Sequence, residues 1–146
     1  MITVERIVEV DRPIEAIFAY LADFTHTEQW DPGTVRTTRV DVAPLSVGAR
    51  FHNVSQFRGR RTELDYVLKV YDLDKHLVFT GNNKTVEATD DLSLRSDRPG
   101  TTTITYRAHF RFKGVARLAE PFLRPRFEPI ADDTVAQLAQ TLKSVL

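Results

Sequence analysis

The sequence predicts an α+β domain, with helices packed against one face of an antiparallel sheet of about seven strands. The central segment, residues 34–113, alternates apolar and polar side chains and is interrupted by short turn signals. Residues 2–10 are rich in β-branched side chains, and the end of the chain carries apolar residues at helical spacing. With 146 residues and neither a linker nor an internal repeat, the chain is expected to form one domain, residues 1–146.

The composition narrows the possible classes of function. Hydrophobic residues make up 42% of the chain and charged residues 27%, which is typical of soluble globular domains. Because 20 basic side chains offset 20 acidic ones, the sequence has no electrostatic signature of a nucleic-acid binder or of a membrane-surface binder. Membrane insertion is not predicted either. The absence of cysteine excludes disulfides and thiol catalysis. The first residues contain no cleavable signal, so we expect a cytoplasmic protein.

A helix is expected after the opening strand. Asp11 is a good N-cap candidate, and Pro13 suits the first turn of a helix. The chain then continues through an irregular segment to Trp30 and a turn at residues 31–33. The apolar face of the helix is formed by Ile14, Ile17, Phe18 and Leu21.

Six strands are expected in the central segment. In the clearest one, Tyr106 and Phe110 share a face with other apolar residues, and charged side chains occupy the opposite face. One apolar and one polar face, joined by short turns, predict an antiparallel meander with one face in contact with solvent. The expected strands cover residues 34–42, 49–57, 62–71, 76–81, 85–94 and 101–113.

The C-terminal part of the chain carries two apolar stripes at helical spacing. The later one begins near residue 129, and the earlier one, which includes Leu118 and Phe122, lies about 140° away around a helix axis. Prolines at 121, 125 and 129 separate the two, and a proline inside a helix removes a backbone hydrogen bond. We therefore expect a short helix near 115–120, a break between Pro121 and Pro129, and a long helix from about 129. In the alternative, Pro121 and Pro129 only begin successive helices.

Several short motifs occur in an order that resembles one known superfamily. These are a D-x-P-x-x-x-[IV]-[FW] helix start at 11–18, D-F at 23–24, W-D-P-G at 30–33, V-G-x-x-F at 47–51, KHLVF at 75–79, and Gly100-Thr101 before an alternating strand. Together they resemble the START-like (SRPBCC) superfamily in its polyketide cyclase/dehydrase-like branch. The resemblance runs over nearly the whole chain.

This resemblance implies a helix-grip fold, in which a strongly curved antiparallel sheet wraps around a long C-terminal helix. It also implies a cavity that binds or transports a hydrophobic or amphipathic small molecule, such as a lipid, a polyketide or an aromatic metabolite. The alternative is an enzyme of the polyketide cyclase/aromatase type. Residues 58–60 hold a single glycine, so the glycine-rich loop of the pollen-allergen branch is missing and its ligands are not carried over.

The candidate ligand contacts come from the expected strands, the turn near Trp30 and the C-terminal segment. Trp30 is either a ligand contact or a packing anchor, and the aromatic side chains on the strands line either a cavity or the core. Phe51 and Asn53 share an inward face, unless the register is shifted by one residue. Arg126 either meets an acidic head group or extends to solvent. The nine candidates are Trp30, Phe51, Asn53, Tyr66, Phe79, Tyr106, Phe110, Phe122 and Arg126.

No cofactor is predicted for this chain. The four histidines are dispersed, and no zinc-binding, phosphate-binding or dinucleotide-binding motif occurs, so neither a metal nor a nucleotide is expected. No residue stands out as catalytic, and a non-enzymatic ligand-binding protein is favoured over an enzyme. In a cyclase, polar groups such as Asn53, Tyr66, Tyr106 or Arg126 would orient a poly-β-ketone. A titratable group with a strongly shifted pKa in the pocket would distinguish the two.

Overall fold

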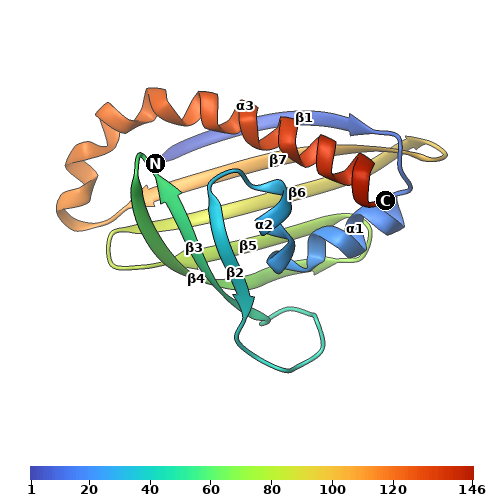
Figure 1. Cartoon of the computed structure of the whole chain (residues 1–146), viewed down its shortest axis with the longest axis horizontal. Helices are drawn as coiled ribbons and strands as arrows, with labels where there is room; N and C mark the ends of the chain where they lie inside the picture. The colour runs from blue at the N-terminus through green and yellow to red at the C-terminus, as the bar shows by residue number, and fades with distance from the viewer.

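A computed structural model describes the whole chain, residues 1–146. A seven-stranded antiparallel sheet curves around one long helix, which confirms the predicted α+β class and the helix-grip arrangement (Figure 1). The elements are β1 (Ile2–Val10), α1 (Ile14–Ala22), η1 (Phe24–His26), α2 (Thr27–Trp30), β2 (Thr34–Arg39), β3 (Arg50–Phe57), β4 (Arg60–Asp72), β5 (His76–Asn82), β6 (Val86–Arg98), β7 (Thr101–Phe112), η2 (Gly114–Ala119) and α3 (Glu120–Val145).

The strands follow the order β1-β7-β6-β5-β4-β3-β2. The first strand, β1, therefore forms one edge of the sheet and pairs with β7, the last strand of the meander. Every neighbouring pair is antiparallel, and each expected strand is present. Because side chains alternate along a strand, one face of the sheet carries the buried apolar residues and the other faces solvent. The helices pack over the apolar, concave face (Figure 1).

The long helix α3 lies against β1 and α2, and polar contacts fix its position. Arg6 of β1 donates to Glu128 at 2.6 Å and to Asp132 at 2.7 Å, one helical turn further on. At the other end of α3, Arg12 donates to the backbone carbonyl of Lys143 at 2.7 Å, which satisfies one of the carbonyls that a helix end leaves without a partner.

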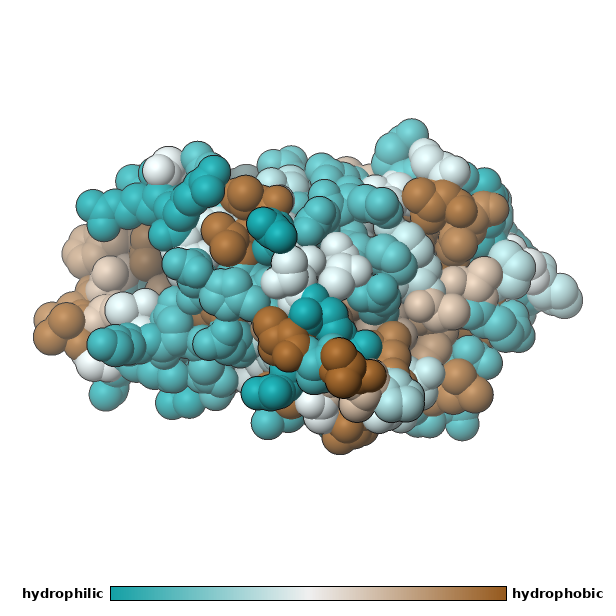
Figure 2. All heavy atoms as spheres, turned by 60° about the horizontal axis from the view of Figure 1, so that its bottom comes forward, coloured by the Kyte–Doolittle hydropathy of each residue, from teal (hydrophilic) through white to brown (hydrophobic).

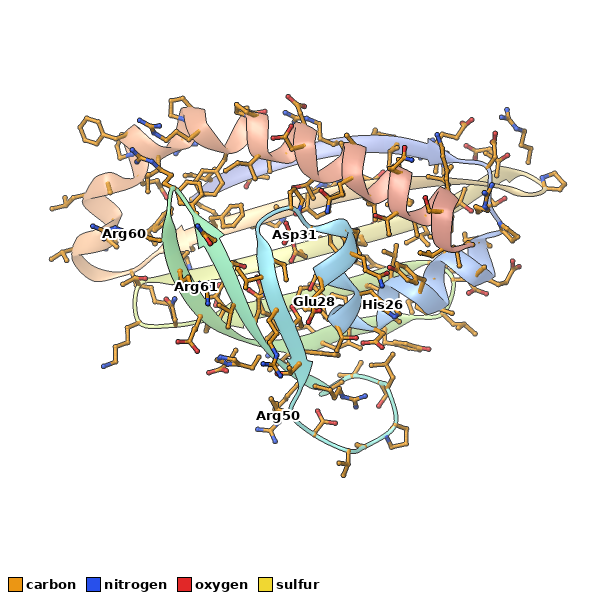
Figure 3. The ribbon with its side chains drawn as sticks, in the orientation of Figure 1. His26, Glu28, Asp31, Arg50, Arg60 and Arg61 are labelled. Carbon is orange, nitrogen blue, oxygen red and sulfur yellow. The ribbon has the colours of Figure 1, made fainter.

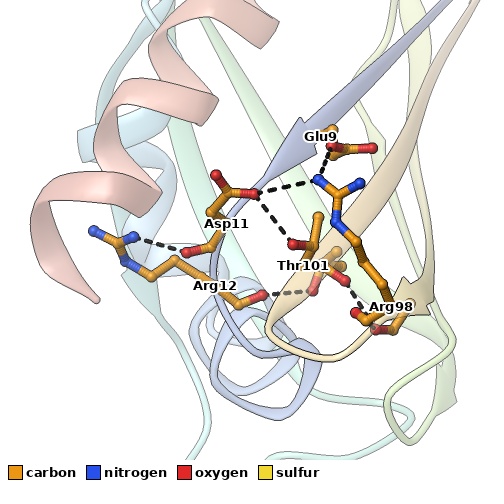
Figure 4. Close-up of polar contacts among 7 residues, drawn as sticks. Glu9, Asp11, Arg12, Arg98 and Thr101 are labelled. Carbon is orange, nitrogen blue, oxygen red and sulfur yellow. Dashed lines mark hydrogen bonds and ion pairs between the residues drawn. The ribbon is translucent and has the colours of Figure 1, made fainter.

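The hairpin between β6 and β7 is joined to the end of β1 by a second group of polar contacts (Figure 4). Arg98 pairs with Glu9 at 3.0 Å, and the hydroxyl of Thr101 donates to Asp11. Asp11 therefore contacts the hairpin, and the N-cap position of α1 is occupied by Pro13 without a side-chain hydrogen bond. The prediction that Asp11 caps this helix is wrong.

The expected helix break between Pro121 and Pro129 is absent. An expected short helix is present as η2, but α3 is continuous from Glu120 to Val145 and includes Pro125 and Pro129. The prolines are four residues apart, so the N–H missing at Pro125 would have met the carbonyl of Pro121, and the N–H missing at Pro129 that of Pro125. Both internal prolines are exposed, so water can solvate the carbonyls left without a partner. One helix then buries only one stripe, and Val115, Leu118 and Phe122 remain on the surface.

Candidate functional site

Asp90 is the one charged residue on the inward face of β6. That face also carries Val86, Ala88, Leu92 and Leu94, two residues apart along the strand, and the last three are buried. The carboxyl group of Asp90 therefore lies among apolar side chains. Asp90 nevertheless keeps part of its surface accessible, unlike its neighbours Ala88 and Leu92.

The phenol of Tyr106, on the adjacent strand β7, donates a hydrogen bond of 2.9 Å to the Asp90 carboxyl group. Burial among protein atoms raises the pKa of Asp90 to about 7, and the negative charge of Asp31 adds to this rise. The hydrogen bond from Tyr106 acts in the opposite direction, because it stabilises the carboxylate. By accessible surface Asp90 is only half-buried, yet surrounding protein strongly desolvates it. A side chain that lies deep in the fold and still borders open space has both properties.

Asp31 lies directly after α2, between the helices and the strands (Figure 3). Its carboxylate accepts hydrogen bonds from the backbone N–H of Gly33 at 3.0 Å and from the hydroxyl of Thr34 at 2.9 Å. Burial raises the pKa of Asp31, while these two bonds lower it by favouring the charged form. With a pKa of about 7, Asp90 is still partly protonated near neutral pH.

Two further aromatic groups complete the site. Burial is the main cause that raises the pKa of Tyr66 and of Tyr106 well above the usual phenol value, and both nearby carboxylates contribute. Both phenols therefore stay neutral, and the hydroxyl of Tyr66 makes no hydrogen bond to the protein. The indole N–H of Trp30 is buried without an acceptor, and its ring meets that of Tyr106 edge to face at 6.2 Å.

We refer to Trp30, Asp31, Tyr66, Asp90 and Tyr106 as the acidic–aromatic cluster. It combines an acid that titrates near neutral pH with hydrogen-bond donors that have no protein partner. A buried donor without an acceptor is costly, and the cost is removed when a bound molecule supplies an oxygen. The arrangement suits a ligand oxygen, such as a carbonyl or a hydroxyl, on a molecule that is otherwise apolar.

The residues proposed from sequence have different positions in the structure. Trp30, Tyr66 and Tyr106 belong to the cluster, and Phe110 packs on Phe127 with ring centroids 4.5 Å apart. Phe51 and Phe79 are completely buried and pack with Phe24. The ring of Phe24 packs against both, and their own rings meet edge to face at 6.1 Å, so the three form one aromatic group in the core.

Asn53 faces inward, but its hydrogen bonds are already made within the protein. It donates to Thr37 at 2.8 Å and accepts from Ser55 at 2.6 Å. Phe122 was expected in the cavity wall and is instead 79% exposed, because the continuous helix turns its side chain to solvent. Arg126 is also exposed, and its guanidinium makes no ion pair.

Arg126 lines a groove of about 370 Å³ between α3, the end of β3 and the turn that precedes β2. Pro32 and Gly33, which follow Asp31 in the chain, line the same groove, so it begins one residue from the cluster. The remaining lining residues are Gln56, Phe57, Arg58, Ile130 and Asp133. The five residues of the cluster do not themselves line this groove.

Asp31 and Asp90 were both missed from the sequence. In the segment Thr89-Asp90-Asp91, three polar residues follow each other, a composition typical of an exposed segment. A signal was nevertheless present, because Asp90 is in phase with Ala88, Leu92 and Leu94.

No group of three or more His, Cys, Asp or Glu side chains is placed to hold a metal ion.

The fold and the site place the chain in a class of helix-grip proteins with a polar cluster inside an apolar concave face. The family model described as "Polyketide cyclase / dehydrase and lipid transport" matches residues 1–143, and the chain belongs to this family. No curated protein matches the chain in sequence.

Solved structures share the fold at low sequence identity. A START superfamily protein from Mycobacterium smegmatis is 15% identical with a TM-score of 0.74, and the match covers 97% of this chain and 94% of that one. The Zhui aromatase/cyclase from Streptomyces sp. R1128 is 12% identical with a TM-score of 0.74, covering 95% and 89%. The di-domain aromatase/cyclase BexL from the BE-7585A biosynthetic pathway is 14% identical with a TM-score of 0.75. That match covers 98% of this chain and 47% of BexL, so the chain spans about half of the di-domain protein.

Proposed function

We propose that this domain binds an amphipathic small molecule whose apolar body lies against the concave face of the sheet and whose oxygen reaches the acidic–aromatic cluster. The observation that carries the proposal is the Tyr106–Asp90 hydrogen bond on an otherwise apolar face. Membership of a family described by polyketide cyclisation and lipid transport supports a ligand of this kind.

The polar end of the ligand would meet donors that the protein does not use itself. The indole N–H of Trp30 has no acceptor, and protonated Asp90 and neutral Tyr66 can each donate. A carbonyl oxygen accepts two hydrogen bonds, so these groups can hold it from two sides. The groove beside Asp31 supplies the entry, with Arg126 and Arg58 at its rim.

Phe24 would have to move for a large ligand to enter. Its ring lies between Phe79, at a centroid distance of 4.3 Å, and Tyr66, at 4.6 Å. Phe24 belongs to the short segment η1, which is three residues long and joins α1 to α2. A displacement of this segment is less costly than one of a strand, because it breaks few backbone hydrogen bonds.

The pKa of Asp90 favours a second function, that of a cyclase or dehydratase acting on a poly-β-ketone. A general acid–base group works best when its pKa is near the working pH, and about 7 meets this condition. As a carboxylate, Asp90 would take a proton from the carbon between two carbonyls. The resulting enolate oxygen would be held by donors of the cluster, and the enolate carbon would attack a second carbonyl. Protonated Asp90 would give this proton to the alkoxide that the attack forms, which yields a hydroxyl group. The Asp90 carboxylate would then take the second proton from the same carbon and deliver it to the departing hydroxyl, which leaves as water while the carbon–carbon double bond forms.

A titration followed by Trp30 emission tests the binding function, because Trp30 is the only tryptophan. We expect a saturable change in emission with an aromatic β-diketone or a flavonoid, and none with an alkane of similar size. Native mass spectrometry of the purified protein should show a bound small molecule. If no compound with a carbonyl alters the emission or remains bound, the proposal fails.

The variant Asp90→Asn distinguishes binding from catalysis. The amide is similar in size and still donates a hydrogen bond, but it cannot exchange a proton. A pure binding protein should keep its affinity within a few-fold and lose its pH dependence. A cyclase should keep the affinity and lose turnover of a poly-β-ketone by a factor of about 10²–10⁴, the usual contribution of a general acid–base group.

A further inference from the structure

The start of the C-terminal helical region exposes an apolar stripe. Val115 and Leu118 of η2 are 87% and 77% exposed, and Phe122 in the first turn of α3 is 79% exposed. Their spacing of three and four residues places them on one side, and Figure 2 shows apolar atoms at this end of the molecule among hydrophilic ones. Isolated apolar residues are common on protein surfaces, but a contiguous stripe usually marks an interaction site.

Cationic side chains surround this stripe. Residues 111–126 contain five arginine or lysine residues and only one acid, Glu120, so the segment has a net charge of +4 in a chain whose net charge is zero. Glu120 is already paired with the N-terminus at 2.9 Å. The guanidinium groups of Arg117 and Arg126 make no hydrogen bond or ion pair with the protein, and Arg60 lies at the same end of the molecule (Figure 3). The field around the stripe is therefore positive.

Next to the stripe, η2 leaves a groove of about 840 Å³ between itself and the end of the sheet. Arg111, Lys113 and Arg117 line it together with Val115 and Leu118. The groove thus combines cations that can bind an anionic group with apolar side chains that can contact a hydrocarbon chain. This combination matches the two parts of an anionic phospholipid.

We propose that η2 and the first turn of α3 form a docking surface for a bilayer that contains anionic lipids. The apolar stripe enters the interface between head groups and acyl chains, and the cations contact the phosphates around it. A second copy of the chain fits less well, because two such surfaces would bring net positive charge against net positive charge. The contact is peripheral, since no helix is long and apolar enough to cross a membrane.

Docking would also place the entry groove beside the bilayer. Arg126 belongs to the cationic segment and lines the groove that begins next to Asp31. A ligand that partitions into membranes could then pass between the bilayer and the acidic–aromatic cluster without crossing water. The docking itself does not depend on the proposed ligand, so the two can fail separately.

Sedimentation with lipid vesicles tests the proposal. The full chain is mixed with vesicles of phosphatidylcholine alone, or of phosphatidylcholine with phosphatidylglycerol, at low and at high salt. We expect binding to the anionic vesicles at low salt, and much weaker binding to neutral vesicles or at high salt. Leu118→Ser with Phe122→Ser should reduce the partition coefficient by about tenfold or more. Arg117→Gln with Arg126→Gln should reduce it by about fivefold per arginine.

Matched controls come from exposed residues elsewhere on the surface. Leu73 is 63% exposed in the β4–β5 turn, between two aspartates, and Leu73→Ser should bind vesicles like the wild-type chain. Arg36 is exposed and unpaired on β2, and Arg36→Gln should also bind normally. All substituted side chains are on the surface, so thermal unfolding should be unchanged in every variant.

Three results would overturn the proposal. The first is that the wild-type chain fails to sediment with anionic vesicles, or that the controls weaken binding as much as the stripe variants. The second is a concentration-dependent dimer that Leu118→Ser with Phe122→Ser abolishes, which would assign the surface to a second copy. The third is binding that needs the arginines but not the stripe, which would indicate an acidic soluble partner.

Discussion

The phenol ring of Tyr66 lies directly over Gly81 on the neighbouring strand. A Cβ atom built on Gly81 would come within 2.6 Å of the Cε2 and Cζ atoms of this ring. The close approach holds the ring flat against β5, inside the concave face, and so fixes the position of its hydroxyl in the acidic–aromatic cluster. The backbone of Gly81 is not left-handed, so the requirement for glycine comes from the ring and not from the backbone.

Gly81→Ala should therefore destabilise the protein by about 1–3 kcal/mol, the usual cost of an overpacked core. It should also displace Tyr66 and alter any ligand affinity. Urea unfolding measures the first effect. Gly33→Ala is the control, because its new methyl group would meet only ordinary contacts at 3.6 and 3.8 Å. Equal stability of the two variants would show that the ring moves aside at no cost.

The stability of the protein should depend on pH through Asp90. Its pKa is about 7 in the folded protein and near 3.8 in the unfolded chain, so the folded state binds the extra proton between these values. The contribution of Asp90 to the free energy of unfolding should therefore be largest below about pH 4. It should fall as the pH rises to about 7, by at most about 4 kcal/mol.

Asp90→Asn should remove this dependence and be the more stable protein at pH 8. Chemical unfolding at several pH values gives the two profiles, and their difference isolates Asp90 from the other acids. If the wild-type and variant profiles remain parallel from pH 4 to 8, Asp90 does not titrate in this range.

Tyr106→Phe should raise the pKa of Asp90 still further. The phenol stabilises the carboxylate by its hydrogen bond, so its loss favours the protonated acid. The carboxyl carbon of Asp90, followed by NMR as a function of pH, should show its transition at a higher pH. Tyr71→Phe is a suitable control, because the hydroxyl of Tyr71 has no hydrogen-bond partner and its ring packs on Phe18. If the transition of Asp90 moves to lower pH in Tyr106→Phe, the hydrogen bond from the phenol does not stabilise the carboxylate.

Replacement of the internal prolines of α3 should stabilise the protein. An interior proline costs a helix up to about 3 kcal/mol, partly offset by the lower entropy of the unfolded chain. We therefore expect Pro125→Ala and Pro129→Ala to raise the free energy of unfolding by about 1–2 kcal/mol each. Pro121→Ala should have little effect, because Pro121 lies in the first turn, where its missing N–H needs no partner. Destabilisation by the two interior substitutions would mean that this region requires a kink.

Local periodicity was sufficient for most of the fold. The alternation of residues 101–113 identified β7 and the inward direction of Tyr106, and the spacing of Ala131, Leu138 and Leu142 identified the buried side of α3. These patterns are reliable because a strand or a helix that buries one face must repeat with its own period. The order of the elements then defined the α+β class.

The tertiary structure decided which residues meet, and with them the chemistry of the site. Asp31 and Asp90 are far apart in sequence, and only the folded chain brings the charge of the first close enough to raise the pKa of the second. Phe24 packs against Phe51, Tyr66 and Phe79, which are far from it in sequence, and the continuous helix leaves Phe122 exposed. Burial and Coulomb interaction depend on distances in space, which no local pattern contains. The sequence therefore predicted which strand faces point inward, but only the structure identified Asp90 as the acid on such a face.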